Sequence, residues 1–181
     1  MPMQAGSEKT LRRMASRTSQ PAFRPLADTA RAAIPDLNLS TDLIVGFPGE
    51  TDADFAESLD YVREIGFSRL HVFTYSQRPG TAAAKMPDQV PGPVKKERAH
   101  RLIDLGQEMS LAFHRRFEGD TRAVLWETAV GADNDGLRWV GYTDNYMRVH
   151  AHGPADLFNR VTPTRLTTAQ ADGLSGVISH R

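Results

Sequence analysis

The 181-residue sequence predicts an α/β fold: a partial (β/α) barrel over residues 1–118, followed by a small antiparallel β-barrel over residues 119–181. Two observations lead to this prediction. Helix and strand patterns alternate in the first part, which is typical of parallel βαβ units with right-handed crossovers. After residue 118, short strand patterns recur at regular intervals between turn-forming residues, as they do in small barrels.

The first part begins with a helix and a strand. Residues 25–34 are expected to form a short helix, because Pro25 suits a first turn and Pro35 prevents continuation. Alternating apolar residues over 37–45 then predict a strand, and the glycines and proline of 46–49 end it. An order of helix, strand, helix and strand favours a parallel sheet.

The next helix has clear start and stop signals. Thr51 is a good N-cap with Asp54 three residues on, and Gly66 suits the position after the last turn. Residues 69–75 are rich in β-branched and aromatic side chains, so they predict a second strand. The apolar stripe of the helix is expected to consist of Phe55, Leu59, Val62 and Ile65.

A proline-rich segment, 79–93, is expected to be a structured loop, and a long helix then runs from Pro93 to a stop at Gly119. Its apolar face is expected to contain Leu102, Leu105, Met109, Ala112 or Phe113, and Phe117. Five short strand candidates follow, at 123–127, 137–142, 146–151, 160–167 and 174–179.

The first part is too short to close a barrel. It offers two strands and a third candidate that ends at Gln4, whereas a (β/α) barrel needs about six to eight strands to bury both faces of its sheet. Either the chain is a fragment or a partner completes the sheet.

The composition excludes several function classes. The chain has no cysteine, which excludes disulfides, thiolate zinc sites, a cysteine nucleophile and cysteine-ligated iron–sulfur clusters. Basic and acidic residues balance at 22 each, so bulk charge does not indicate a nucleic-acid binder. No apolar run approaches the roughly 20 residues that cross a bilayer, and the start has no secretory signal pattern. We therefore expect a cytoplasmic protein with no membrane partner.

Three segments follow expected strands, where loops and helix N-termini converge in parallel α/β folds. They are 4–7, 46–51 and 75–81. Glycines in the second segment allow the backbone to approach a flat ligand closely, while Phe73 and Tyr75 can supply an aromatic wall. Each segment taken singly is better explained as a turn than as a ligand site.

Two further groups have structural explanations. His150 and His152 lie on one face of a strand candidate and could begin a metal site, but no third ligand is evident nearby, and paired surface histidines explain them better. Asp42 is expected to support the strand end and Glu50 to cap the following helix, whose dipole favours a carboxylate.

Taken together, the strand-end segments resemble those of radical S-adenosylmethionine tRNA methylthiotransferases. Residues 1–7 (MPMQAGS), 41–51 (TDLIVGFPGET) and 73–83 (FTYSQRPGTAA) resemble the fourth, fifth and sixth strands of that family with their loops. Residues from about 118 onward resemble its RNA-binding TRAM barrel. Segment 141–149 (GYTDNYMRV) is most similar to the branch that methylthiolates N6-threonylcarbamoyladenosine beside the tRNA anticodon.

The resemblance implies a transferase that uses S-adenosylmethionine and two 4Fe-4S clusters, one held by a Cys-x3-Cys-x2-Cys motif and one by an N-terminal domain. Neither cysteine set is present in this chain, and both lie upstream of the residue that matches Met1. We therefore expect a chain that lacks an N-terminal segment, or that works with a separate chain, and that is inactive alone. The implied cofactor-side residues are Gln4, Ser7, Gly46, Phe73 and Tyr75.

The implied RNA partner is the tRNA anticodon stem-loop. Arg78 is expected to face RNA or the phosphate and ribose of the cofactor. Tyr142, Tyr146 and Arg148 lie around a predicted tight turn, where rings can stack on unpaired bases and arginine can meet phosphate. Tyr142 could instead fill the small barrel. A non-catalytic tRNA-binding module is the alternative function, because tRNA contact requires no cysteine.

Overall fold

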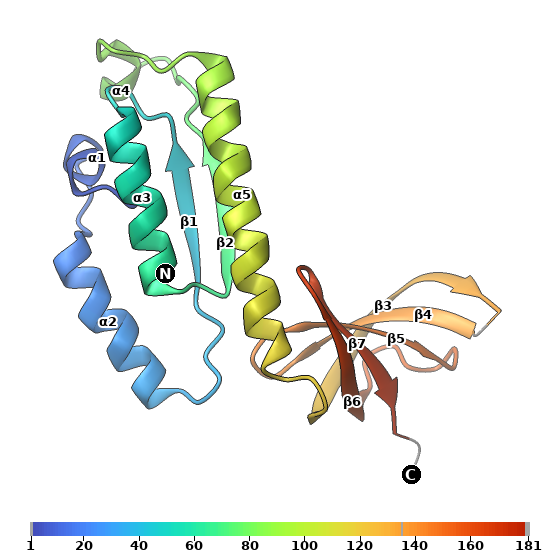
Figure 1. Cartoon of the computed structure of the whole chain (residues 1–181). Coiled ribbons are helices and arrows are strands. Elements are labelled where there is room, and N and C mark those ends of the chain that lie inside the picture. Colours follow the sequence, from blue (N-terminus) through green and yellow to red (C-terminus); the bar gives the residue numbers. More distant parts are fainter. Residues whose placement is uncertain (1, 135, 180–181) are drawn as a thin grey trace. The chain divides into compact units, whose positions relative to one another are not determined.

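The computed structural model describes residues 2–134 and 136–179 and divides into two compact units, one ending at Met109 and the other beginning at Ser110 (Figure 1). The boundary lies inside a helix, upstream of the position near 118 that the sequence suggested, because the end of this helix packs on the second hydrophobic core. The elements of the first unit are α1 (Glu8–Arg13), α2 (Gln20–Ala33), β1 (Ser40–Val45), α3 (Asp52–Ile65), β2 (Arg69–Thr74), α4 (Ala82–Lys85) and most of α5 (Gly92–Arg115).

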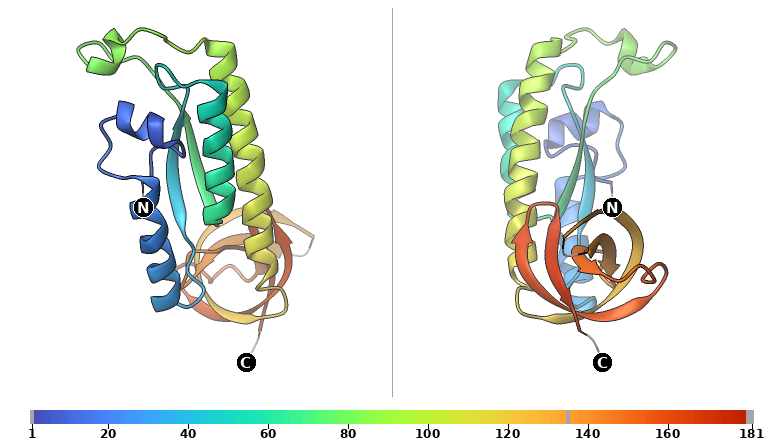
Figure 2. Two further views of the ribbon diagram at one scale, coloured as in Figure 1. Left: turned by 60° about the vertical axis from the view of Figure 1, so that its left-hand side comes forward. Right: turned by 90° about the vertical axis from the view of Figure 1, so that its right-hand side faces the viewer.

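The centre of the first unit is a parallel pair of strands. β1 and β2 pair in register from Ser40 opposite Arg69 to Val45 opposite Thr74. The expected third strand is reduced to one parallel bridge, in which Gln4 donates its N–H to the carbonyl of Asp42 at 3.0 Å. Helices α3 and α5 lie over one face of the strands (Figures 1 and 2).

The burial pattern of β1 follows from this one-sided cover. Thr41, Leu43 and Val45 are buried, whereas Asp42 and Ile44 on the opposite face are only partly buried. Strand residues alternate between faces, so the helices cover the first set and leave the second accessible. The core beneath the helices is closed by Phe55, Leu59, Val62 and Ile65, which confirms the predicted stripe.

Local signals place α3 as predicted. The Thr51 hydroxyl accepts the Asp54 N–H at 3.2 Å, and the Asp54 carboxylate accepts the Thr51 N–H at 2.8 Å. This reciprocal pair is a capping box, which satisfies two N–H groups that a helix start leaves open. Gly66 ends the helix with φ of 70°, a left-handed conformation that glycine adopts without steric cost.

Two helix predictions were wrong. α2 begins at Gln20 rather than Pro25, because the Ser19 hydroxyl caps it and Pro21 suits its first turn, so Pro25 lies inside the helix. The segment expected to be loop throughout contains α4, whose first turn is capped by the Thr81 hydroxyl.

The second unit is a five-stranded sheet. Its strands are β3 (Thr121–Asp133), β4 (Gly136–Thr143), β5 (Arg148–Gly153), β6 (Val161–Gln170) and β7 (Gly173–Ile178). The pairing order is β3-β4-β5-β7-β6, and β6 also pairs with β3, so each strand has two neighbours. The pairing of β5 with β7 is parallel, which corrects the wholly antiparallel prediction. Trp126, Met147, Val149, Leu166 and Leu174 are the fully buried centre.

Candidate functional site

A cavity of about 800 Å³ opens at the carboxyl ends of β1 and β2. We call it the strand-end cavity. It brings together four residues that the sequence singled out, Gln4, Phe73, Tyr75 and Arg78. The rest of its lining consists of Met14, Ser16, Asp42, Ile44, Phe47, Thr74, Ser76, Thr81 and Ala83.

One wall of the strand-end cavity is aromatic. The rings of Phe47 and Tyr75 meet edge to face, with centroids 5.3 Å apart. Phe73 is 54% exposed, which is unusual for a large apolar side chain in a strand. The Tyr75 hydroxyl is buried without a hydrogen-bond partner among the described residues. Such a wall can take a flat ring, and the hydroxyl can serve a polar atom of a ligand.

Gln4 has a strained backbone conformation. Its φ of 74° is in the left-handed region, which costs a non-glycine residue roughly 1–2 kcal/mol. The bridge to β1 holds this conformation, since the Gln4 carbonyl accepts the Ile44 N–H at 2.8 Å. Strained residues of this kind cluster at binding sites. The bridge places the Gln4 side chain on the cavity lining.

Ser7 and Gly46 do not line the strand-end cavity. Ser7 is fully buried, and its hydroxyl accepts the Thr10 N–H at 3.4 Å to cap α1. Gly46 has φ of 72°, and a Cβ at this position would overlap the side chain of Lys95. Ser7 therefore caps α1 and Gly46 leaves room for Lys95, and neither residue is part of the cavity lining.

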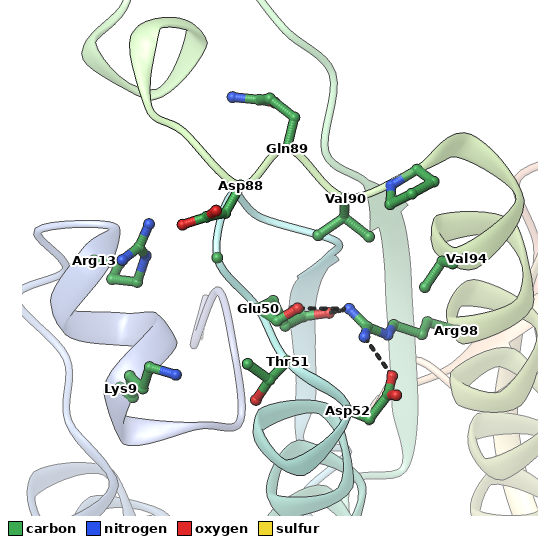
Figure 3. A pocket seen from close by; sticks show the side chains of 12 residues that line it. Lys9, Arg13, Glu50, Thr51, Asp52, Asp88, Gln89, Val90, Val94 and Arg98 are labelled. Carbon is green, nitrogen blue, oxygen red and sulfur yellow. Dashed lines mark hydrogen bonds and ion pairs between the residues drawn. The ribbon is translucent and has the colours of Figure 1, made fainter.

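A second pocket, of about 680 Å³, lies beside the β1–α3 loop (Figure 3). Its central feature is a buried ion pair in which Arg98 Nη1 donates to Glu50 Oε1 at 2.7 Å. Only 4% of the Arg98 side chain and 2% of the Glu50 side chain are exposed. Arg98 also donates to the Glu50 carbonyl at 3.1 Å and to the Asp52 carboxylate at 2.7 Å.

The sequence had assigned Glu50 to the cap of α3, and the structure corrects that assignment. Glu50 Oε1 accepts the Gly46 N–H at 3.0 Å, so the carboxylate braces its own loop. Burial raises the pKa of Glu50 above its ordinary value, although the Gly46 N–H and Arg98 both favour the ionised form. Lys95, one turn before Arg98, donates to the Tyr75 carbonyl at 3.0 Å. α5 is thus hydrogen-bonded to the segments that follow both strands, through Arg98 to Glu50 after β1 and through Lys95 to Tyr75 after β2.

Three predicted RNA contacts gather on the second unit. Tyr142 lies opposite Arg148 in the β4–β5 pair, and both are partly exposed. Tyr146 is 78% exposed in the turn between these strands, where the Thr143 hydroxyl accepts the Met147 N–H at 3.0 Å. Arg148 Nε is buried with no hydrogen-bond partner among the described residues. The fourth, Arg78, is exposed on the first unit.

Within residues 2–134 and 136–179 no group of three or more histidine, aspartate or glutamate side chains is arranged to hold a metal ion. His152 Nε2 lies 3.0 Å from Asp133 Oδ2, and His150 Nε2 lies 3.7 Å from Asp172 Oδ2. Each histidine therefore faces a carboxylate of its own. None of the helices described is long and apolar enough to cross a membrane.

No protein-family model matches the chain. Curated relatives do. The chain is 38% identical over 93% of its length to "Threonylcarbamoyladenosine tRNA methylthiotransferase MtaB" of Bacillus subtilis (strain 168). It is 40% identical over 99% of its length to "tRNA-2-methylthio-N(6)-dimethylallyladenosine synthase" of Bacillus velezensis. It spans 38% and 35% of the length of these two relatives. The predicted resemblance to tRNA methylthiotransferases is thus confirmed at the level of homologues.

A solved structure of similar fold matches the chain. It is described as "Coproporphyrinogen III oxidase (HemN) from Escherichia coli is a Radical SAM enzyme" and superposes with a TM-score of 0.50 at 18% identity. The match covers 99% of this chain and 45% of that chain. This structural neighbour therefore supports the α/β fold of the chain.

Proposed function

We propose that this chain is part of a tRNA methylthiotransferase. The observation that carries the proposal is the 38–40% identity, over 93–99% of the chain, to relatives named for the methylthio modification of tRNA. In this proposal residues 1–118 are the C-terminal portion of a radical S-adenosylmethionine barrel with its linker helix, and residues 119–181 are a TRAM-like RNA-binding domain.

The strand-end cavity suits one side of an S-adenosylmethionine site. Phe47, Phe73 and Tyr75 offer apolar and aromatic surface for an adenine ring, and Gln4 and Asp42 offer hydrogen-bonding groups for ribose or amino-acid atoms. The unpartnered Tyr75 hydroxyl supports a polar ligand there. Ser7 and Gly46 would contribute indirectly, Ser7 by capping α1 and Gly46 through the positive φ that it gives the β1–α3 loop.

The iron–sulfur clusters of the family do not fit this chain. Such clusters are held by cysteine thiolates, and the chain has no cysteine. Any cluster would need ligands from another segment or chain. The activity proposed here therefore belongs to a larger assembly, to which this chain contributes cavity wall and RNA surface.

The RNA partner proposed is the anticodon stem-loop, in the cytoplasm, where Tyr142, Tyr146 and Arg148 would contact unpaired bases and phosphate. Segment 141–149 supports the N6-threonylcarbamoyladenosine branch, and the B. subtilis relative carries that name. Arg78, on the cavity lining, would face RNA or cofactor from the first unit.

The test is binding of anticodon stem-loop RNA by the purified chain at low and moderate salt. Arg148→Ala is expected to weaken binding roughly tenfold, the scale of one charge-assisted contact, without lowering the melting temperature. Arg165→Ala, an exposed arginine on β6, is the matched control and should change affinity little. Equal affinities of parent and Arg148→Ala would remove this residue from the proposed surface.

A non-catalytic RNA-binding module is the second candidate, favoured by the absence of cysteine. Calorimetric titration with S-adenosylmethionine separates the two. The enzyme-part proposal expects weak binding that Phe73→Ala abolishes, whereas a pure RNA module binds the stem-loop and ignores the cofactor.

A further inference from the structure

A third cavity, of about 320 Å³, lies on the five-stranded sheet and plays no part in the site described above. We call it the β5 cavity. Its polar lining comes from four strands and one turn, and consists of Arg138, His150, His152, Gln170, Asp172 and Ser175. Its volume is at the lower end of ligand pockets, which run from roughly 300 to 1,000 Å³. It is therefore suited to one small ring system.

The topology of the sheet indicates that nucleic acid would bind on the face that carries the β5 cavity. An order of β3-β4-β5-β7-β6 with a parallel β5–β7 pair is that of the five-stranded OB type of barrel. Proteins of that type bind oligonucleotides on the face of their second and third strands and on the loops that follow the first and fourth strands. In this chain those strands are β4 and β5, and the loop after the fourth strand is the β6–β7 turn, which carries Asp172.

The outward face of β5 carries side chains that can hydrogen-bond to RNA. Arg148, His150 and His152 alternate with the buried Val149 and Ala151, so all three side chains share one face. Their cross-strand neighbours on β4 are Tyr142 opposite Arg148, Val140 opposite His150 and Arg138 opposite His152. The β5 cavity thus continues the surface on which RNA binding is proposed.

His150 has no hydrogen-bond partner at Nε2 within residues 2–134 and 136–179, and a ligand in the β5 cavity could supply one. Its Nε2 is buried and makes no hydrogen bond with any described residue, and 3.7 Å to Asp172 Oδ2 is too long for one. A buried polar atom left without a hydrogen bond destabilises the folded state. Burial lowers the pKa of His150, and Arg148 and Arg138 lower it as well, against the opposing effect of Asp172. This shift in pKa favours the neutral imidazole, which has one donor and one acceptor.

We propose that the β5 cavity binds the base of one unpaired RNA nucleotide, with His150 and Asp172 hydrogen-bonded to its edge. The carboxylate of Asp172 accepts hydrogen bonds and repels phosphate, so it selects a base edge and favours bases with an exocyclic amino group. Splayed bases read on their edges are the usual targets of sequence-specific RNA recognition. The inference rests on the proposed function, because it names a subsite of the RNA surface.

The direct test needs no variant. Histidine imidazole resonances of the full chain are followed by NMR while AMP, CMP, GMP, UMP or ribose 5-phosphate is added. The His150 resonances should shift with AMP, CMP and GMP, in a saturable manner at millimolar concentrations, and less with UMP. His100, an exposed residue of α5, serves as an internal control and should not move. Equal shifts with ribose 5-phosphate would identify an anion site and overturn the proposal.

A variant pair then tests the carboxylate. Asp172→Ala should weaken AMP binding roughly tenfold, the scale of one good hydrogen bond to a charged group. Asp156→Ala, an exposed carboxylate of the same unit that does not line the cavity, should leave it unchanged. If stem-loop RNA binds Asp172→Ala and His150→Ala as well as the parent, the subsite is refuted and the proposed function stands. If the parent binds no RNA yet AMP still shifts His150, the proposed function fails and the base site stands.

Discussion

Replacing Arg98 by methionine is expected to destabilise the first unit more than any exposed charge substitution. The guanidinium neutralises Glu50 in a place where both side chains are at least 96% buried. Removing one partner of a buried ion pair leaves an uncompensated charge, which costs about 3–5 kcal/mol. Methionine keeps the apolar stem of the side chain but loses the guanidinium carbon Cζ, which lies 5.5 Å from the centroid of the Phe55 ring, so the loss reports the ion pair together with this contact.

The pH dependence of this loss has a definite sign. Burial already raises the pKa of Glu50 above the ordinary 4.5, and without Arg98 it should rise further. A raised carboxyl pKa in the folded state means that ionised Glu50 costs stability increasingly as pH rises above 4.5. The difference between Arg98→Met and the parent should therefore shrink as pH falls toward 4.5. Arg98→Met combined with Glu50→Gln should recover part of the loss at neutral pH.

The assay is urea unfolding followed by the helical circular dichroism signal, because the long helices belong mainly to the first unit, whereas both tryptophans are in the second. Arg63→Met is the matched control. Its pair with Asp60 is 3.2 Å long, but the two side chains are 60% and 80% exposed, so roughly 0–1 kcal/mol is expected. A loss for Arg98→Met no larger than this control, and independent of pH, would refute the reasoning.

Three further outcomes are expected. Leu43→Ala, at a site 1% exposed between β1 and its helices, should lower the free energy of unfolding of the first unit by about 2–5 kcal/mol in the same urea assay. The pKa of His150 is lower in the folded state than the ordinary 6.5, so the unfolded chain binds more protons as pH falls below that value. The second unit should therefore lose stability below pH 6.5 by tryptophan fluorescence, and His150→Asn should flatten the profile, whereas an unchanged slope contradicts the burial argument. Reconstitution with iron and sulfide should leave the purified chain without a cluster by iron assay and absorption, and stoichiometric iron would require ligands other than thiolate.

Local sequence signals were sufficient where neighbouring residues decide the structure. Thr51 with Asp54, and Gly66 after the last turn, located α3 because caps satisfy backbone groups within a few residues. The strand-end residues Gln4, Phe73 and Tyr75 were also found from sequence, since the carboxyl ends of parallel strands meet at one edge of a sheet. The cap of α2 at Ser19 was available in the same way and was missed because Pro25 offered a competing start.

Only the tertiary structure decided which distant residues share a site. Arg98 and Glu50 are 48 residues apart. No spacing rule in the sequence connects an arginine on α5 with a carboxylate in the loop after β1. The same holds for His150 and Asp172, which meet because β5 and β7 pair in parallel, a register that alternating short strands do not encode. By itself the sequence determined the limits of α3, the strand-end aromatic residues and the absence of thiolate ligands, because these depend on residue type and local spacing. Burial, pKa and cavity lining depend on the packing of the whole unit, and so only the structure could assign them.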